Sequence, residues 1–296
     1  MVRMGGRNKP KFSFGVVTAL PLEFAPMQVM LDHWEKLRPI EDDPNVYVRG
    51  DIAAKNGKGL IPVILTLLPG TGNNRAAESA THLLRSFKVD HLLMVGIAGG
   101  VPNHRKPKEH VRLGDVVVSD KVIQYDYGSF VKGKNFLKGS SSPPSDQLLS
   151  AVKFLEAERI AGRSPWESYI ERASELENAG RPPMSADVLH HPTKPKRILT
   201  HPTDKCRRPG HPKVLYGPIG SGNVVMKDAR RRDALRKELG LLAIEMEGSG
   251  ISDASKGKYL VVRGICDYCD IHKNDVWQPY AAVAAAAYAR ALIELF

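Results

Sequence analysis

Hydrophobic residues in this chain gather in short runs that alternate with longer stretches of mixed polarity. The runs are typical of buried strands and predict strands over residues 12–19, 60–66, 91–95, 115–119, 214–219, 241–245 and 258–264. Apolar residues at helical spacing predict helices over residues 22–33, 74–87, 226–239 and 275–295, and a further helix between Glu247 and the last strand. Because strands alternate with helices, we expect an α/β fold whose mixed, mostly parallel sheet carries helices on both faces.

Three local signals refine these elements. Pro62 lacks a backbone N–H, which places its strand near an edge of the sheet or places Pro62 near the start of that strand. Asp275 and Gln278 have the spacing of a capping box and predict that the last helix begins there. The alanine-rich segment 281–287 favours close packing in the core or against another copy of the chain.

A stretch from about residue 130 to residue 211 breaks the alternation. It contains segments that predict helices over residues 147–160 and 165–179, and then it becomes rich in Pro and His. Its apolar content is too thin for a core of its own, so we expect a single domain over residues 1–296 that carries this insertion. The sequence does not distinguish a lid from an oligomer contact or a partner surface.

Acidic residues follow two of the predicted strands. Glu245, Met246 and Glu247 end one apolar run, and Asp267 ends another. The carboxyl ends of strands in such sheets meet at a ligand-binding edge, so we expect these side chains to form an active site. A helix N-terminus for the glutamates and a turn for Asp267 are the structural alternatives.

Two glycine-bearing turns lie at the same predicted edge. Residues 70–75 join a strand to a helix, so their backbone amides form a ready anion site, although glycine is also common there for conformational reasons alone. Residues 96–100 end a strand and allow a ligand to approach the backbone. Neither turn has the pattern of a Walker loop or of a convincing dinucleotide fingerprint.

Composition limits what these residues can mean. The 296 residues, 42% of them hydrophobic, suffice for a substantial core. Three cysteines are too few for a disulfide framework and favour a reducing compartment. Apolar runs stay well short of the roughly 20 residues that span a bilayer, and the N-terminus lacks an apolar signal segment. We therefore expect a cytoplasmic protein without membrane segments.

The formal net charge of +11 favours an anionic partner. Much of the excess lies in residues 105–108, 194–197, 205–208 and 230–232. Nucleic acid is disfavoured, because no aromatic residues interleave with the basic ones and no zinc-finger spacing occurs. A phosphorylated small molecule fits better. The His and Cys spacings match no standard metal site, so we expect neither a metal nor a cofactor.

The motifs together resemble those of a known superfamily. Residues 19–23, 96–100, 113–119, 220–223, 245–247 and 266–267 occur in the order found in nucleoside phosphorylases and methylthioadenosine/adenosylhomocysteine nucleosidases. The resemblance covers about residues 12–128 and 212–296 and implies a three-layer α/β fold. Within that superfamily, segments 263–274 and 277–282 look like the branch found in immune-type proteins of fungi and bacteria, some of which are ATP nucleosidases.

The resemblance implies roles for the site residues. Asp267 would be the acid that protonates the departing purine, and Glu23 would orient the attacking water. Glu247 would accept hydrogen bonds from the ribose hydroxyls, with Met246 under the sugar and Glu245 in support. Arg263 would hold the water or a substrate anion, and Arg75 would meet the 5′-phosphates of a nucleotide. The remaining substrate-binding positions are Val225 and Met226 at the base, together with Asn223, Ala98, Gly99 and Gly70.

The nucleophile divides the enzymatic alternatives. Phosphorylases of the superfamily carry an arginine and a serine or threonine where this chain has Met94 and Ile97. Apolar side chains do not coordinate phosphate, and Glu23 is retained, so we expect hydrolysis. The main expectation is a nucleosidase that splits ATP or dATP into adenine and a sugar triphosphate. The alternatives are a phosphate-dependent phosphorylase and a non-catalytic nucleotide-sensing or oligomerisation module. The resemblance implies a homo-oligomer, and the sequence leaves open whether a signalling partner or activator is needed.

Overall fold

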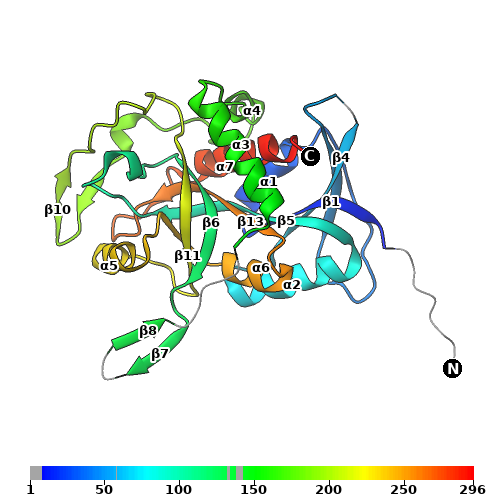
Figure 1. The fold of residues 1–296 in the computed structure, drawn as a ribbon, viewed down its shortest axis with the longest axis horizontal. Coiled ribbons are helices and arrows are strands. Elements are labelled where there is room, and N and C mark those ends of the chain that lie inside the picture. Colours follow the sequence, from blue (N-terminus) through cyan, green and yellow to red (C-terminus); the bar gives the residue numbers. More distant parts are fainter. Residues whose placement is uncertain (1–8, 58, 132–133, 138–142) are drawn as a thin grey trace.

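The computed structural model describes residues 9–57, 59–131, 134–137 and 143–296. One large mixed sheet forms its centre, and helices cover both faces of that sheet (Figure 1). The strands of the sheet are β1 (Lys11–Thr18), β2 (His33–Lys36), β3 (Tyr47–Ala53), β4 (Leu60–Leu67), β5 (Lys88–Gly100), β6 (Val116–Gln124), β11 (Val214–Ser221), β12 (Ala243–Glu245) and β13 (Tyr259–Asp267).

These strands lie in the order β12-β11-β6-β13-β5-β1-β4-β3-β2, and β12 also pairs with β5. That extra pairing closes β12, β11, β6, β13 and β5 into a ring. Five strand pairings in the described part of the sheet are parallel and four are antiparallel. The predicted α/β fold with a mixed, mostly parallel sheet is therefore confirmed.

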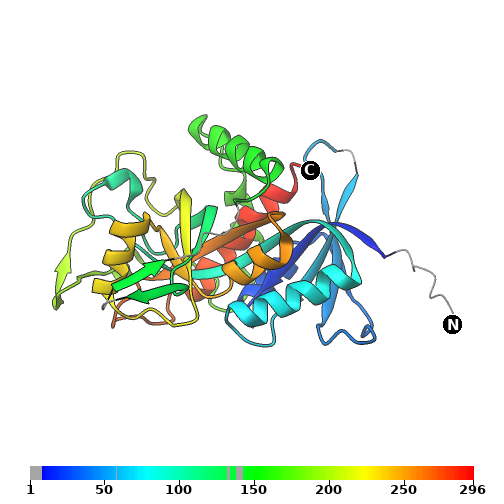
Figure 2. The same ribbon diagram turned by 60° about the horizontal axis from the view of Figure 1, so that its bottom comes forward.

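The helices form the two outer layers. Helices α1 (Pro21–Val29) and α7 (Gln278–Ile293), with α3 (Asp146–Ile160) and α4 (Trp166–Arg172) outside them, cover one face. Helices α2 (Asn73–Ser86) and α6 (Gly248–Ser255) lie side by side under the other face (Figure 2). Helix α5 (Ala229–Leu239) packs at the closed end of the sheet, beside β12.

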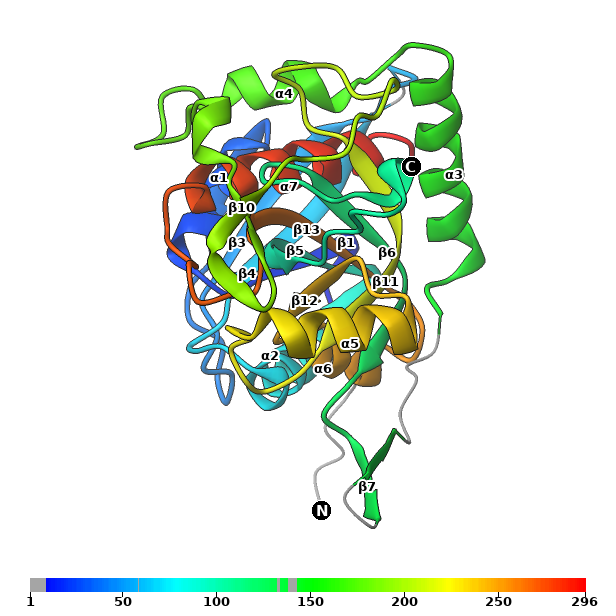
Figure 3. The ribbon, with the colours of Figure 1, turned by 90° about the vertical axis from the view of Figure 1, so that its left-hand side faces the viewer.

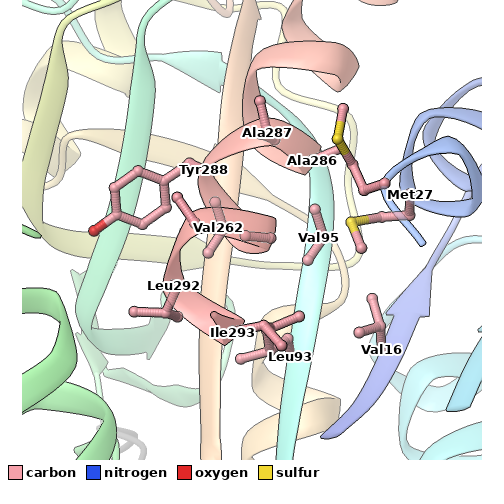
Figure 4. Packing of buried hydrophobic residues seen from close by; sticks show 14 of the residues in the cluster. Val16, Met27, Leu93, Val95, Val262, Ala286, Ala287, Tyr288, Leu292 and Ile293 are labelled. Atoms are coloured by element: carbon pink, nitrogen blue, oxygen red, sulfur yellow. The ribbon is translucent and has the colours of Figure 1, made fainter. Parts of the chain in front are cut away.

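The alanine-rich helix α7 forms the centre of one core. Ala286 and Ala287 face Val95 of β5 and Val262 of β13 (Figure 4). The helix lies so close to β13 that a Cβ built on Gly264 would stand 1.8 Å from the carbonyl oxygen of Ala281. The predicted role of the alanines in core packing is confirmed, and the two strand ends that carry the site are thereby held against a rigid helix.

The structure decides between the two placements expected for Pro62 and shifts the predicted start of the last helix. Strand β4 pairs with both β1 and β3, so it is not an edge strand; Pro62 lies near its start, which is the second expected placement, before the register with β1 begins at Val63. Helix α7 begins at Gln278 and not at Asp275; the side chain of Gln278 bonds to the side chain of Asp275, and no side chain caps the helix at Trp277. Strands β2 and β3 were not predicted.

The segment expected to be an insertion folds into small elements around the sheet (Figure 3). It contains α3 and α4, the hairpin β9 (Leu189–His191) and β10 (Lys194–Leu199), and most of the hairpin β7 (Gly128–Val131) and β8 (Lys134–Leu137). Buried residues such as Leu155 and Trp166 join the core that α7 forms. The division into one domain with an insertion stays a prediction. No helix in the described ranges has the length and hydrophobicity to cross a bilayer.

Candidate active site

A cavity of about 230 Å³ opens where β5, β12 and β13 end. The loop before α1, the turn before α2 and the segment after β11 complete its walls. Its lining residues are Ala19, Leu20, Glu23, Thr71, Ile97, Ala98, Gly99, Val224, Val225, Met226, Ile244, Glu245, Met246, Glu247, Cys266, Asp267, Cys269, Lys273 and Gln278.

Asp267 is the last residue of β13 and lies 4% exposed in this cavity. One carboxylate oxygen accepts the backbone N–H of Cys269 at 2.8 Å. The other meets the ammonium of Lys273 and the thiol of Cys266, the latter at 3.3 Å. A Cβ on Gly99 would stand 2.8 Å from the Asp267 carboxylate and 2.2 Å from the sulfur of Cys269. Glycine at this position of β5 therefore makes room for the carboxylate.

Three carboxylates surround one guanidinium beneath the cavity. Arg263 of β13 is fully buried, and its Nη2 donates to Glu245 and, at 3.1 Å, to Glu247. Its Nη1 lies 3.7 Å from the carboxylate of Glu23. Burial disfavours the charged guanidinium, but the three carboxylates outweigh that effect and raise the pKa of Arg263. The arginine is thus a fixed cation that holds three acids of the cavity wall in place.

Backbone amides hold the same acids from other elements. Glu245 accepts the N–H groups of Glu247 and Gly248 at 2.8 to 3.0 Å, at the start of α6. Glu247 accepts the N–H of Gly72 at 3.0 Å, which joins the turn before α2 to the residue that precedes α6. These bonds fix the acidic cluster across two elements far apart in sequence.

Glu23 lies near the start of α1 and is 2% exposed. One of its oxygens accepts the N–H groups of Ala19 and Leu20 at 2.7 and 3.0 Å. The other accepts the N–H of Ile97 at 2.8 Å. Gly96 permits this contact, because a Cβ there would stand 2.3 Å from the Glu23 carboxylate. The carboxylate is therefore held at the junction between α1 and the end of β5.

Burial raises the pKa of two of these carboxyl groups. It raises the pKa of Glu247 to about 7, with the nearby Glu245 carboxylate adding to the rise and Arg263 opposing it. Burial likewise raises the pKa of Glu23, against the pull of Arg263 and three backbone amides. Both carboxylates consequently hold protons more tightly than exposed ones do, as is common for groups that take part in proton chemistry.

The structure brings most of the predicted site residues together. The cavity is lined by Asp267, Glu23, Glu247, Met246, Glu245, Val225, Met226, Ala98 and Gly99. Arg263 lies behind the lining, and Asn223 lies beside it, accepting the N–H of Asn73 at 3.1 Å. Gly70 precedes the lining residue Thr71. Arg75 turns to solvent, with 59% of its side chain exposed, and lies 3.5 Å from Glu78. The individual roles of all these residues stay predictions.

Two backbone N–H groups of the predicted anion-binding turn at residues 70–75 already have acceptors within the protein. The N–H of Gly72 bonds to Glu247, and the N–H of Asn73 bonds to Asn223. Gly72 has a φ of 110°, a backbone conformation that side chains rarely adopt. The turn therefore supports the acidic wall as well as the rim of the cavity.

Sequence reasoning missed Lys273, Thr71, Cys269 and Gln278 among the lining residues. Lys273 lies in the loop after β13, where no periodicity marks a position that points inward. Its one signal is its place six residues after Asp267, within the segment quoted for the family resemblance. The described residues contain no group of three His, Cys, Asp or Glu side chains that suits a metal ion.

Comparison with known proteins places the chain. The sequence model of the phosphorylase superfamily matches residues 14–294. The chain belongs to this superfamily. It is 34% identical, over 311 aligned positions, to a nucleotide-binding leucine-rich repeat (NLR)-like protein of Hyaloscypha variabilis. It is 25% identical, over 285 positions, to the ATP nucleosidase Cap17 of Escherichia coli.

The two matches cover 99% and 92% of this chain but only 30% and 49% of the respective relatives, so the chain spans a third to a half of their length. Among solved structures, the fold is similar to a 5′-methylthioadenosine/S-adenosylhomocysteine nucleosidase of Neisseria meningitidis in complex with methylthio-immucillin-A. That match has a TM-score of 0.63 at 18% identity and covers 96% of this chain and 99% of the other. The predicted three-layer fold and superfamily are confirmed.

Proposed function

We propose that this chain hydrolyses the N-glycosidic bond of a purine nucleoside or nucleotide. The observation that carries the proposal is one cavity lined by Asp267, Glu23 and Glu247 together. Cleaving this bond requires a proton for the departing base and stabilisation of a sugar that becomes cationic, and carboxylates suit both tasks. Membership of the superfamily and similarity to an ATP nucleosidase support the same reaction class.

The residues divide between the two ends of such a substrate. Asp267 would face the base, between Val225 and Met226 on one side and Ala98 and Gly99 on the other. Glu247 would accept hydrogen bonds from the ribose hydroxyls, and Met246 would pack under the sugar. Glu23 would orient the water that attacks the anomeric carbon. The buried Arg263 would keep Glu23, Glu245 and Glu247 in the positions that these contacts need.

Charge favours water over phosphate as the nucleophile. Lys273 is the only Lys or Arg among the lining residues of the cavity in the described part of the chain, and it is paired with Asp267. Arg263 is enclosed by three carboxylates. An inorganic phosphate would therefore meet carboxylates without a free cation, which is electrostatically unfavourable. A neutral water carries no such penalty.

Within this class we propose an adenine nucleotide, ATP or dATP, as the substrate. The similarity to Cap17 and the net charge of +11 support this choice. Because the cavity offers no free cation, the phosphates would project from its rim, beside Thr71 and the N-terminus of α2. Arg75 lies in the first turn of that helix and is exposed. It would meet the phosphates there by bidentate hydrogen bonds.

The Arg75 assignment has a direct test. Arg75→Ala should lower kcat/KM for ATP by roughly tenfold, the usual order for one exposed charge-assisted contact, and leave kcat/KM for adenosine unchanged. The exposed Arg85 on the same helix supplies a control, Arg85→Ala. An Arg75→Ala protein that keeps the wild-type preference for ATP over adenosine would refute the assignment.

One assay tests the reaction itself. The protein is incubated with ATP, adenosine or methylthioadenosine, with and without inorganic phosphate, and release of free base is followed by chromatography. Release from ATP without phosphate supports the proposal, and phosphate-dependent release would identify a phosphorylase instead. No release from any of the three would leave a non-catalytic nucleotide sensor. Asp267→Asn protein serves as the blank for contaminating enzymes.

The relatives suggest a setting for this activity. The two relatives named above are longer than this chain, and one is an NLR-like protein. We propose that the nucleosidase acts as an effector in defence, as part of an assembly of several copies that an activator switches on. In that setting an isolated chain would show a low basal rate, and measuring the rate against protein concentration would reveal the assembly step.

A further inference from the structure

Every polar group that bonds to the side chain of Asp267 in the described part of the chain is a hydrogen-bond donor. This side chain accepts hydrogen bonds from the backbone N–H of Cys269 and the thiol of Cys266, and it forms an ion pair with the ammonium of Lys273. Neither the amide nor the thiol carries a positive charge, so the contact with Lys273 is the one ion pair among the three. A departing purine needs a proton at N7, so the site must contain a proton source beside Asp267.

Lys273 and Cys266 are the two candidates that touch Asp267 and line the cavity. Deprotonated Cys266 would be a thiolate next to a carboxylate, and this residue is 2% exposed. Burial and the neighbouring Asp267 accordingly raise the pKa of the Cys266 thiol well above its usual value. Lys273 becomes neutral when it gives up its proton, and its side chain is 26% exposed, so solvent can restore that proton.

We infer that Lys273 supplies the proton for the leaving base, through Asp267. This inference rests on the proposed nucleosidase reaction. As the bond between C1′ and N9 breaks, its electron pair passes to the base. Lys273 passes one proton to the Asp267 carboxylate, and the carboxyl group so formed passes that proton on to N7. Water adds to C1′ and loses one proton, which returns Lys273 to its ammonium form. The products are the neutral base and the sugar hydroxyl.

The groups around Lys273 are compatible with this transfer. Asp267, Cys266 and Cys269 face it, and Arg232 and Asp270 lie beyond Cys269. Burial raises the pKa of the Cys269 thiol as well, so neither thiol competes for the proton at neutral pH. Burial works against the charge of Lys273, but the attraction of Asp267 prevails and raises its pKa. The lysine therefore stays charged, and loaded with a proton, across the physiological range.

The rival explanation is that Lys273 acts only as a fixed charge that holds Asp267 in place. Arginine separates the two, because a guanidinium keeps the ion pair but does not release its proton. Lys273→Gln separates them in another way. Without the lysine, Asp267 must take its proton from water, and that becomes easier as the pH falls.

The test is the pH profile of base release from the preferred purine substrate by wild type, Lys273→Arg and Lys273→Gln. Lys237→Gln, at an exposed lysine of α5, serves as the control. At neutral pH both Lys273 variants should lose about 100-fold in kcat, within the usual contribution of a positioned acid. The Lys273→Gln rate should rise towards low pH, while the control keeps the wild-type profile.

A second substrate excludes a folding defect. 4-Nitrophenyl riboside, with the 5′ group of the preferred substrate, has a leaving group that departs without a proton, so the variants should retain its hydrolysis. A wild-type rate in Lys273→Arg, or an equal loss in Lys273→Gln at every pH, would overturn the inference. If the wild-type protein released no base from any purine substrate, the proposed function itself would be rejected.

Discussion

One buried arginine faces three carboxylates, so the cluster contains more acidic groups than basic ones. Arg263 faces Glu23, Glu245 and Glu247, each of which is at most 5% exposed. Backbone amides from the loop before α1, from β5, from α6 and from the turn before α2 also donate to these carboxylates. The excess of carboxylates is tolerated at the cost of stability, as is usual where a site is arranged for function. Glu247, with its pKa raised to about 7, shows that cost most directly.

Replacing Glu247 should reveal this cost as a pH dependence of stability. Because burial raises the pKa of Glu247 from 4.5 to about 7, the folded protein binds more protons than the unfolded chain between these values. Stability contributed by this group is therefore lost as the pH rises through that window. At pH 8 Glu247→Gln should be more stable than wild type by about 1 to 3 kcal/mol.

Denaturant unfolding of Glu247→Gln and wild type between about pH 4 and pH 8 measures this difference. The gain should shrink towards pH 4, where Glu247 is protonated in both states. Asp253→Asn, at an exposed carboxylate of α6, is the control and should show no such trend. A Glu247→Gln protein less stable than wild type at pH 8 would contradict the stated balance of charges. The same variant should also lose ribose binding, which an increased KM would report.

At the scale of elements, the site depends on how closely α7 lies on β13. Gly264 falls between Arg263 and Asp267 on that strand, and a Cβ there would stand 1.8 Å from the carbonyl oxygen of Ala281 and 2.4 Å from its carbon. Both atoms belong to the backbone of a helix buried along most of its length, so no flexible side chain can make room. The strand or the helix must move.

Gly264→Ala should accordingly destabilise the fold by about 3 kcal/mol or more, the upper range for overpacking a core. Activity should fall with it, because Arg263 and Asp267 share the displaced strand. Gly180→Ala is the matched control, since a Cβ at Gly180 meets nothing within 4 Å. The thermal unfolding midpoints of the two variants measure this difference in stability. Equal midpoints for both would mean that the contact between α7 and β13 is looser than described.

The sequence predicted elements where burial leaves a regular trace and missed them elsewhere. The buried strands β1, β11 and β13 and helix α2 were predicted with ends within three residues of those observed. Strand β2 is exposed along its whole length and carries no apolar period. Strand β5 was expected to end before its glycines, yet it continues to Gly100 because β13 and β12 pair with that segment.

The same limit applies to the candidate site. Asp267 and Glu247 could be predicted because each follows an apolar strand, so the parallel arrangement alone brings them to one edge. Lys273 could not, since its place in the cavity depends on the path of a loop. Arg75 shows the opposite case: it lies in the expected turn, but its side chain points to solvent beside Glu78. Position along the chain does not fix the direction of a long exposed side chain.

At the scale of the whole molecule, the expected insertion reaches the loop that follows Asp267. Asp187 lies near the hairpin of β9 and β10 and accepts a hydrogen bond from the hydroxyl of Tyr268, the residue after Asp267. Arg207 forms two bonds of 2.6 and 2.7 Å with Asp115, whose backbone oxygen accepts the N–H of Ile265. Residues of the insertion therefore brace β13 and the loop that follows it. Any partner that moved the insertion would act on Asp267 through these contacts.

Net charge gives the last prediction, which concerns the whole surface. A chain with a formal charge of +11 attracts a triphosphate from a distance, and salt screens this attraction because the Debye length falls below about 5 Å near half-molar ionic strength. We expect kcat/KM for ATP to fall about tenfold between roughly 50 mM and roughly 500 mM NaCl. Adenosine carries no charge, so its kcat/KM should change little over the same range. Comparing the two substrates, both at the same constant magnesium concentration, separates this screening effect from salt damage to the protein. An equal decline for the two would indicate salt damage to the protein, whereas an unchanged kcat/KM for ATP would mean that the basic surface serves another partner and that the phosphates of the nucleotide contribute nothing to its capture.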